Sequence, residues 1–306
     1  MPRGAYLPSE RPQPAAGADR WRLRSDTLVL GDLPLLMGIV NVTPDSFSDG
    51  GRYLEPAAAV DRALELAAAG ADLLDIGGES TRPGAEPVEA AEELRRVLPV
   101  ITALTERVAT PLSIDTYKAS VAREAVAAGA QIINDVTALT GDAAMLEVAL
   151  QAGCGLCAMH TPGTPQSMHG PAVYGDVVED VLAYLRGRRD ALMAAGVDPA
   201  RLALDPGIGF GKTTEQNLRI LNQARRFHEL RCPLLFGVSR KRFIGQVLGH
   251  TEAGRVAGTV GVALALARRG VQILRVHDVG PVREALRLFQ AAGGLQGLER
   301  EVRGVE

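Results

Sequence analysis

The chain has 306 residues, of which 46% are hydrophobic and 23% are charged, a composition typical of a globular protein with room for one large domain. The net charge of −3 at pH 7 excludes the strongly basic balance of a nucleic-acid-binding protein, so an anionic substrate must meet local positive groups. No stretch approaches the roughly 20 apolar residues of a membrane span, and the 3 cysteines make no disulfide framework, which indicates a cytoplasmic protein.

The N-terminal segment, residues 1–20, is rich in proline and lacks the apolar stretch of a signal peptide, so we expect a loosely ordered tail. Two short segments follow, residues 21–24 and 27–30, and the turn-like pair Ser25-Asp26 separates them. This pattern predicts a small β-hairpin in front of the main domain.

Eight short apolar runs follow, and each ends at or just before residues capable of polar chemistry. The runs are Leu35–Val40, Leu73–Ile76, Leu112–Ile114, Ile132–Ile133, Leu156–Met159, Leu202–Leu204, Leu234–Val238 and Ile273–Val276. Turn signals bound them and amphipathic stretches separate them, as for buried parallel strands between helices. Eight such units predict an α/β protein, a single (β/α)8 TIM barrel with its active site at the C-terminal ends of the strands. We expect the barrel domain, hairpin included, to span residues 21–292, and residues 293–306 to form a second tail.

Amphipathic stretches and helix stop signals predict the helices between the runs. The expected ranges are residues 56–70, a stripe from 94 to 104, and residues 118–128, 142–152, 175–195, 214–227, 255–269 and 281–291. Two turns between a strand and a helix, residues 43–53 and 79–88, are unusually long and rich in polar residues and glycine. Because both would lie at the catalytic end of the barrel, we expect them to close over a substrate.

The segment Asp205–Thr213 ends in Gly-Lys-Thr, like a phosphate-binding loop. Its spacing excludes a Walker A motif, which needs a glycine where Pro206 stands. The glycines are expected instead to let the loop turn tightly over a planar ligand beside Asp205. Thr213 and Gln216 are spaced as a capping box for the next helix.

Cys154 and Cys157 have C-x-x-C spacing, but the pair enters a predicted buried strand instead of beginning a helix. We therefore interpret both as small buried residues and not as a redox or metal site. His160 ends the same strand and is expected to face the site, where a structural hydrogen bond and a catalytic role both remain open. The sequence has no H-E-x-x-H motif or Cys/His cluster that would mark a tight metal site.

The last predicted strand leads into Arg275 and His277, which are two residues apart and therefore point to the same side. Facing the barrel interior, they would form a compact anion site at the rim. A buried arginine needs a partner, so an internal pair with Asp75 is an alternative that is compatible with anion binding. Lys241, near the helix after the preceding strand, adds a third cation to this rim.

Two kinds of side chain thus meet at the rim. The group suited to the edge of a donor- and acceptor-rich heterocycle is Asp115, Asn134 and Asp205. The group suited to a phosphate is Arg82, Arg275 and His277. Asn41 offers a neutral oxygen suited to a Mg²⁺ ion that is shared with substrate phosphates. We therefore expect a substrate with a heterocycle at one end and a phosphoryl group at the other.

Seven segments resemble, in order, the signatures of the dihydropteroate synthase family. They are Met37–Gly51, Asp75–Gly84, Ser113–Thr116, Ile132–Asp135, Asp205–Phe210, Gly237–Lys241 and Arg275–Asp278. The match runs from Leu35 to about Val279, nearly the whole barrel, and the signatures after the first, second and seventh strands are specific together. The segment that begins at His160 matches less well, so the resemblance assigns it no catalytic role.

The resemblance implies a transferase of folate biosynthesis that condenses (7,8-dihydropterin-6-yl)methyl diphosphate with p-aminobenzoate to give 7,8-dihydropteroate and diphosphate. Members of this family are understood to lose diphosphate dissociatively, after which the aniline nitrogen attacks a resonance-stabilised pterin cation. The resemblance further implies Mg²⁺ as cofactor, a homodimer, and competition by sulfonamides for the p-aminobenzoate site. The apolar residues Val262, Leu264 and Leu266 could serve the dimer interface or face the barrel.

The family's site residues carry over by motif onto this chain. Those implied to hold the pterin are Asp115, Asn134, Asp205 and Lys241. Those implied to hold the diphosphate are Asn41, Arg82, Arg275 and His277, with Asn41 also a ligand of Mg²⁺. Those implied to shape the p-aminobenzoate site are Phe47, Thr81, Pro83, Phe210 and Ser239. The residues expected to be catalytic are Asp115, Asp205, Lys241, Arg275 and His277.

Two other functions remain open on the sequence. A pterin barrel that transfers a methyl group from a methylfolate to a corrinoid would share the pterin-binding residues, but it needs no diphosphate rim. A homologue that binds the pterin without catalysing condensation is the second alternative. The presence of Arg82, Lys241, Arg275 and His277 argues against this alternative.

Overall fold

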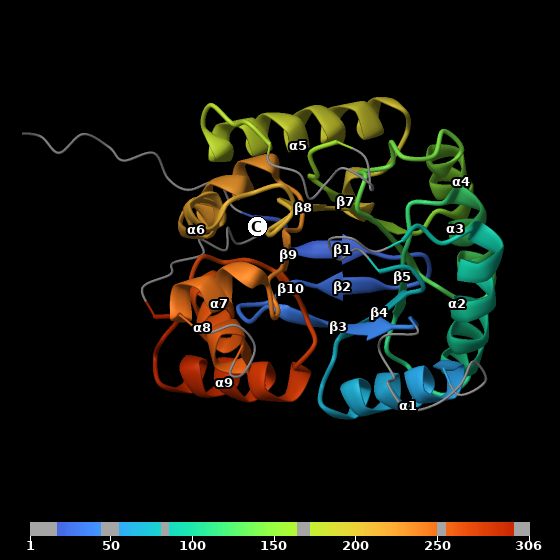
Figure 1. Ribbon diagram of the computed structural model, residues 1–306, viewed down its shortest axis with the longest axis horizontal. Coiled ribbons are helices and arrows are strands. Elements are labelled where there is room, and N and C mark those ends of the chain that lie inside the picture. Colours follow the sequence, from blue (N-terminus) through green and yellow to red (C-terminus); the bar gives the residue numbers. More distant parts are fainter. Residues whose placement is uncertain (1–16, 44–54, 81–85, 164–171, 250–254, 297–306) are drawn as a thin grey trace, which may run out of the picture.

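The computed structural model describes residues 17–43, 55–80, 86–163, 172–249 and 255–296 (Figure 1). All eight apolar runs form strands of one parallel sheet. The strands are β3 (Leu35–Asn41), β4 (Leu73–Gly77), β5 (Leu112–Asp115), β6 (Ile132–Asp135), β7 (Gly155–Met159), β8 (Leu202–Asp205), β9 (Leu235–Gly237) and β10 (Ile273–Val276). Neighbours pair in the order β8-β7-β6-β5-β4-β3-β10-β9. A parallel bridge between Leu204 and Leu234 joins the two ends of this order, so the sheet closes into the predicted barrel.

Helices surround the barrel, as Figure 1 shows. They are α1 (Glu55–Ala68), α2 (Ala90–Thr105), α3 (Ala119–Ala127), α4 (Met145–Ala152), α5 (Val177–Ala194), α6 (Thr214–Asn222), α7 (Arg242–Leu248), α8 (Arg255–Ala267) and α9 (Val279–Ala291). The helix predicted over residues 214–227 is shorter than expected, because α6 ends at Asn222 and a 3-10 segment covers Ala224–Leu230. In the ranges that the structure describes, no helix is both long and apolar enough to cross a membrane.

The predicted hairpin is present as β1 (Arg20–Arg22) and β2 (Thr27–Val29), which pair antiparallel. Its Trp21 is fully buried and donates its indole N–H to the carbonyl of Arg201 at 2.8 Å. Trp21 belongs to an apolar cluster with residues at or near the beginnings of the barrel strands, such as Leu73 and Ile132. The hairpin therefore closes the N-terminal end of the barrel, opposite the expected active site.

Alternation along the strands separates the outer core from the barrel interior. On β4, Leu74 and Ile76 pack in the large core that includes helix residues, whereas Leu73 packs with the hairpin cluster. Asp75 lies between Leu74 and Ile76 in the strand and is fully buried. Because successive strand residues point to opposite faces, Asp75 points inward, as the sequence indicates. The interior thus changes from apolar to polar toward the C-terminal ends of the strands.

Candidate active site

A buried polar network occupies the barrel interior near the C-terminal ends of the strands. One carboxylate oxygen of Asp75 accepts hydrogen bonds from Asn134 Nδ2 at 3.0 Å and Arg275 Nε at 2.6 Å. Arg275 also donates from Nη2 to Asp115 at 2.6 Å. Burial opposes the charge on Arg275, but the two carboxylates hold its pKa above the ordinary value. The internal pair with Asp75, which the sequence leaves open as an alternative, is thus present in the structure.

Arg275 lies between the two predicted groups of site residues. Arg275 belongs to the residues expected to hold a phosphate, and Asp115 belongs to those expected to hold a heterocycle. Their ion pair places the two groups of residues next to each other. Burial raises the pKa of Asp115 to about 7, and the charge of Arg275 opposes this rise. The two groups thus meet at one shared cation, and a ligand spanning both would lie across Arg275.

Asp205, at the end of β8, begins the glycine-rich loop that leads to α6. Burial raises the pKa of Asp205 to about 6, and its Oδ1 accepts a hydrogen bond from the Gly207 amide at 2.7 Å. Gly207 has φ +67°, and a Cβ there would lie 1.9 Å from the carbonyl oxygen of His160. The loop ends in the predicted capping box, which Thr213 and Gln216 both complete. The tight turn expected from the sequence is confirmed.

Lys241 and Phe210 meet on this rim from different loops. The Lys241 ammonium lies 4.2 Å from the centre of the Phe210 ring, within the range of a cation–π contact. Burial, together with the nearby charge of Arg275, lowers the pKa of Lys241 to about 8. Phe210 also packs with Val136 and Met159 in a small apolar cluster. The two residues present a cation and an apolar side chain together.

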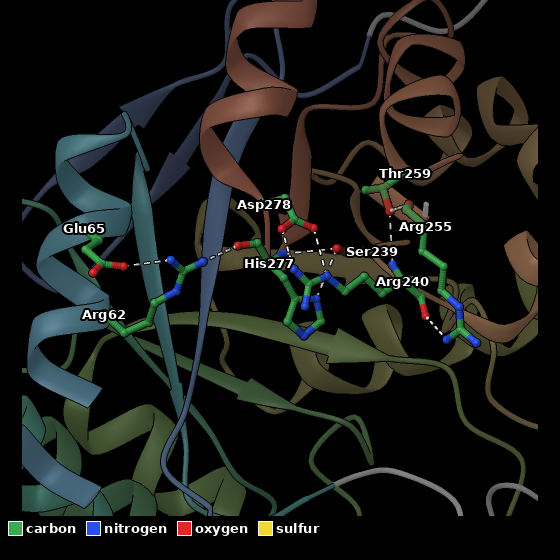
Figure 2. Close-up of polar contacts among 8 residues, drawn as sticks. All are labelled: Arg62, Glu65, Ser239, Arg240, Arg255, Thr259, His277 and Asp278. Carbon is green, nitrogen blue, oxygen red and sulfur yellow. Dashed lines mark hydrogen bonds and ion pairs between the residues drawn. The ribbon is translucent and has the colours of Figure 1, made fainter. Parts of the chain in front are cut away.

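Ser239 and His277 are joined directly at the ends of β9 and β10 (Figure 2). The Ser239 hydroxyl lies 3.1 Å from both the backbone N–H and Nδ1 of His277. Burial lowers the pKa of His277 to about 3, assisted first by the charge of Arg275. The unliganded His277 is therefore neutral at pH 7, and an anion bound beside it would favour its protonated form.

Arg240 supports this corner, a role that its position in the sequence does not indicate. Its backbone is left-handed, with φ 56°, and its amide donates to the Thr259 hydroxyl at 3.1 Å. Its guanidinium makes two bonds to Asp278, at 3.0 and 2.5 Å, as Figure 2 shows. The left-handed residue separates Ser239 from Lys241 in the chain. Only the fold reveals this contact, because Arg240 and Asp278 are 38 residues apart.

His160 follows β7 and is buried. Its Nδ1 lies 3.0 Å from the Lys212 ammonium, and its ring packs edge-on against Tyr184. Burial lowers the pKa of His160 to about 3, and the charge of Lys212 contributes. These contacts favour the structural role that the sequence leaves open. Cys154 and Cys157, on the approach to β7 and within it, are free and buried, as predicted.

Asn41 ends β3 beside Gly77 and is half-buried. The described segments hold no cluster of three or more His, Cys, Asp or Glu side chains with the geometry of a metal site. One neutral amide oxygen fits Mg²⁺ only if water and substrate phosphates complete the shell, which is how Mg²⁺ often binds. Four further predicted residues lie outside the described segments, together with most of the two long loops; they are Phe47, Thr81, Arg82 and Pro83.

Comparisons with known proteins show which family this chain belongs to. The sequence pattern described as "Pterin binding enzyme" matches residues 37–277. A dihydropteroate synthase of Neisseria meningitidis serogroup C is 46% identical over 266 residues, which cover 86% of this chain and 94% of that protein. The solved dihydropteroate synthase of Xanthomonas albilineans with 4-aminobenzoic acid is 48% identical, with a TM-score of 0.84, over 90% of this chain and 98% of that one. The same enzyme in complex with 7,8-dihydropteroate is 46% identical, with a TM-score of 0.81, over 89% and 98%.

Proposed function

We propose that this chain, which belongs to the family of pterin-binding enzymes, catalyses the dihydropteroate synthase reaction. It condenses (7,8-dihydropterin-6-yl)methyl diphosphate with p-aminobenzoate and releases 7,8-dihydropteroate and diphosphate. The observation that carries this function is the buried network around Arg275, where two carboxylates and Asn134 adjoin the rim cations. This arrangement supplies acceptors for a pterin ring and positive charge for a leaving diphosphate in one pocket.

The pterin half of the site is held in shape before the substrate arrives. The side-chain amide of Asn134 donates an N–H to Asp75. The side-chain carbonyl oxygen of Asn134 can then accept a hydrogen bond from the pterin ring. Asp205 uses Oδ1 for the Gly207 amide and presents Oδ2 to the pterin. Asp115 and Lys241 complete the set, so the ring edge meets acceptors and a cation whose positions are already fixed.

The reaction begins with cleavage of the C–O bond between the pterin methylene group and the diphosphate. The electron pair leaves with the diphosphate, whose negative charge Arg275 and His277 stabilise. Positive charge spreads over the pterin ring, where Asp205 stabilises it. The aniline nitrogen of p-aminobenzoate then forms the new C–N bond and loses one proton. The cation must be kept from water, and we propose this role for the segments 43–53 and 79–88, most of which lie outside the described residues.

We infer that Mg²⁺ binds through Asn41, with diphosphate oxygens and water as its other ligands. When bound, the ion neutralises charge on the leaving diphosphate. Asn41 would hold the ion, and Arg82 and Arg275 are the residues that we propose for the phosphate groups. Phe47, Thr81, Pro83, Phe210 and Ser239 shape the p-aminobenzoate site. These assignments rest on the motifs that carry them and on the positions of Asn41, Phe210, Ser239 and Arg275.

We also infer a cytoplasmic homodimer. Leu266 on α8 is buried in the core and faces the barrel, whereas Val262 and Leu264 are only partly buried at the edges of that face. Exposed apolar side chains are found instead on α7 and α9, including Val247 and Leu288. The homodimer itself is inferred from the family that the motifs indicate, and these exposed side chains are candidates for its interface. Light scattering on the purified protein should give twice the chain mass, and a monomer would contradict the dimer.

The activity test uses the purified chain with Mg²⁺, the pterin diphosphate and p-aminobenzoate. We expect dihydropteroate, measured by chromatography, and diphosphate in equal amounts, with no dihydropteroate when either substrate is omitted. A sulfonamide should raise the apparent KM for p-aminobenzoate without changing kcat. Binding of both substrates without product would support a pterin-binding protein that is not an enzyme, and methyl transfer to a corrinoid would support the other family activity.

A further inference from the structure

Lysine is rare in this chain, and its positions are informative. The sequence has 30 arginines but only 3 lysines. Lys118, Lys212 and Lys241 all follow barrel strands, at the end where the site lies. Lys118 pairs with Glu79 and Glu93, and Lys241 lies over Phe210. Arginine and lysine are not interchangeable in hydrogen bonding, so these positions indicate a requirement for an ammonium group.

Lys212 makes a distinct set of contacts. Its Nζ lies 2.8 Å from the carbonyl oxygen of Gly207, 3.2 Å from that of Phe210 and 3.0 Å from Nδ1 of His160. The Phe210 amide in turn donates to the Gly207 carbonyl at 3.3 Å. One ammonium therefore joins both ends of the turn Gly207–Phe210 to the end of β7.

The three acceptors explain why lysine is suited to this place. They converge on one atom, and a protonated lysine has three N–H donors on that atom, whereas arginine distributes its donors over a planar fork. Burial lowers the pKa of Lys212 to about 7, and the charge of Asp205 opposes this fall. Donation to Nδ1 requires a neutral His160 with its own proton on Nε2. The pKa of His160, lowered to about 3 by burial and then by the charge of Lys212, agrees with that form.

The turn that Lys212 holds carries Phe210 toward Lys241. Asp205 lies before this turn, and its carbonyl accepts from the backbone amide of His160 at 2.8 Å, a contact that does not involve the Lys212 side chain. Loss of the ammonium would therefore release the Phe210 end of the turn more than the Asp205 end. In the proposed function, the p-aminobenzoate side of the site depends on Phe210, and the pterin side depends on Asp205.

We propose that Lys212 is a positioning residue: it clamps the turn Gly207–Phe210 to His160 and thereby sets the Phe210 face against which p-aminobenzoate binds. This inference rests on the proposed function, in which Phe210 shapes the p-aminobenzoate site. Lys212 itself touches neither reacting atom. Its effect is transmitted through the backbone of Phe210.

The test compares the steady-state kinetics of wild type and Lys212→Met, which retains an unbranched side chain without its donors. We expect the KM for p-aminobenzoate to rise about tenfold, while the KM for the pterin diphosphate changes by less than about twofold. Equal increases in both KM values, or no increase for p-aminobenzoate, would overturn the proposal. Thr213→Ala is the matched control, because it removes the neighbouring helix cap and should lower Tm without changing either KM.

A second measurement does not depend on catalysis. In ¹⁵N NMR of the full chain, the Nδ1 signal of His160 should be that of a hydrogen-bonded acceptor and should shift toward the unbonded value in Lys212→Met. An unchanged signal would refute the clamp. Failure of wild type to form dihydropteroate, with the NMR shift present, would instead count against the proposed function and leave the contact established.

Discussion

Ionisable side chains at the rim differ in what burial does to them. Burial raises the pKa of Asp115 to about 7 and that of Asp205 to about 6, and it lowers the pKa of Lys241 to about 8. Each shift favours the neutral form, so the site holds charge at a cost in folding stability. A bound pterin offers donors to the carboxylates, which would stabilise their charged forms. Substrate donors would thus offset part of this cost.

The cost at Asp205 predicts how stability varies with pH. An aspartate in the unfolded chain titrates near about pH 4, below the folded value, so ionisation is easier after unfolding. The contribution of Asp205 is therefore fully present below about pH 4 and is lost as the pH rises through about 6. Asp205→Asn should match wild type at acidic pH and exceed its free energy of unfolding above about pH 6, by up to ~3 kcal/mol. Denaturant unfolding between about pH 4 and 7 measures the difference in unfolding free energy between the variant and wild type. An equal difference at all pH values would show that ionisation of Asp205 does not affect stability.

Lys241 provides the clearest test of a single rim residue. Lys241→Ala removes the cation beside Phe210 that we propose to contact the pterin, and kcat/KM for the pterin diphosphate should fall about 100-fold or more. Circular dichroism should show a folded variant. Arg242→Ala is the control. Arg242 is the next residue in the chain and its side chain is exposed, so its removal should change kcat/KM by less than about twofold. Full activity in Lys241→Ala would refute the role assigned to this residue.

At the scale of an element, the loop from β8 to α6 depends on glycine for two separate reasons. Gly207 has a left-handed backbone, and its missing Cβ also admits the carbonyl of His160. Gly249, which caps α7, has φ +73° but no atom within 4 Å of a built Cβ. Comparing alanine substitutions at Gly249 and Gly207 therefore separates the cost of the left-handed backbone from the cost of the steric clash.

Gly249→Ala should reduce the free energy of unfolding by about 1 kcal/mol, the cost of the left-handed conformation. Gly207→Ala should cost at least about 2 kcal/mol more, because the loop must move away from His160. This variant should also weaken binding of both substrates, since Asp205 and Phe210 flank the displaced turn. Denaturant unfolding and substrate titration measure the two effects. Equal stability of the two variants would show that the contact with His160 is relaxed at little cost.

At the scale of the whole molecule, stability and chemistry lie at opposite ends of the barrel. The hairpin closes one end with Trp21, while the polar network occupies the other. Trp21→Ala should reduce the free energy of unfolding by about 3–5 kcal/mol, because it opens a cavity and leaves the Arg201 carbonyl without its indole donor. Below the unfolding temperature, kcat/KM should stay within about twofold of wild type.

Val29→Ala is the matched control for the hairpin, since this side chain is 77% exposed. It should change the unfolding free energy by less than about 0.5 kcal/mol. A large loss of kcat/KM in folded Trp21→Ala would mean that the two ends of the barrel are coupled. Together the two hairpin variants test whether the N-terminal end serves only stability.

The sequence by itself determined the strands, their parallel barrel and the polar residues at their ends, because short apolar runs and turn signals are local patterns. It also determined the capping box of Thr213 and Gln216. Only the tertiary structure decided that Arg275 bonds both Asp75 and Asp115, which are 200 and 160 residues away. The contact of Lys212 with His160, 52 residues apart, is of the same kind. Such contacts depend on barrel closure and strand register, which bring distant segments together in ways that local spacing does not encode.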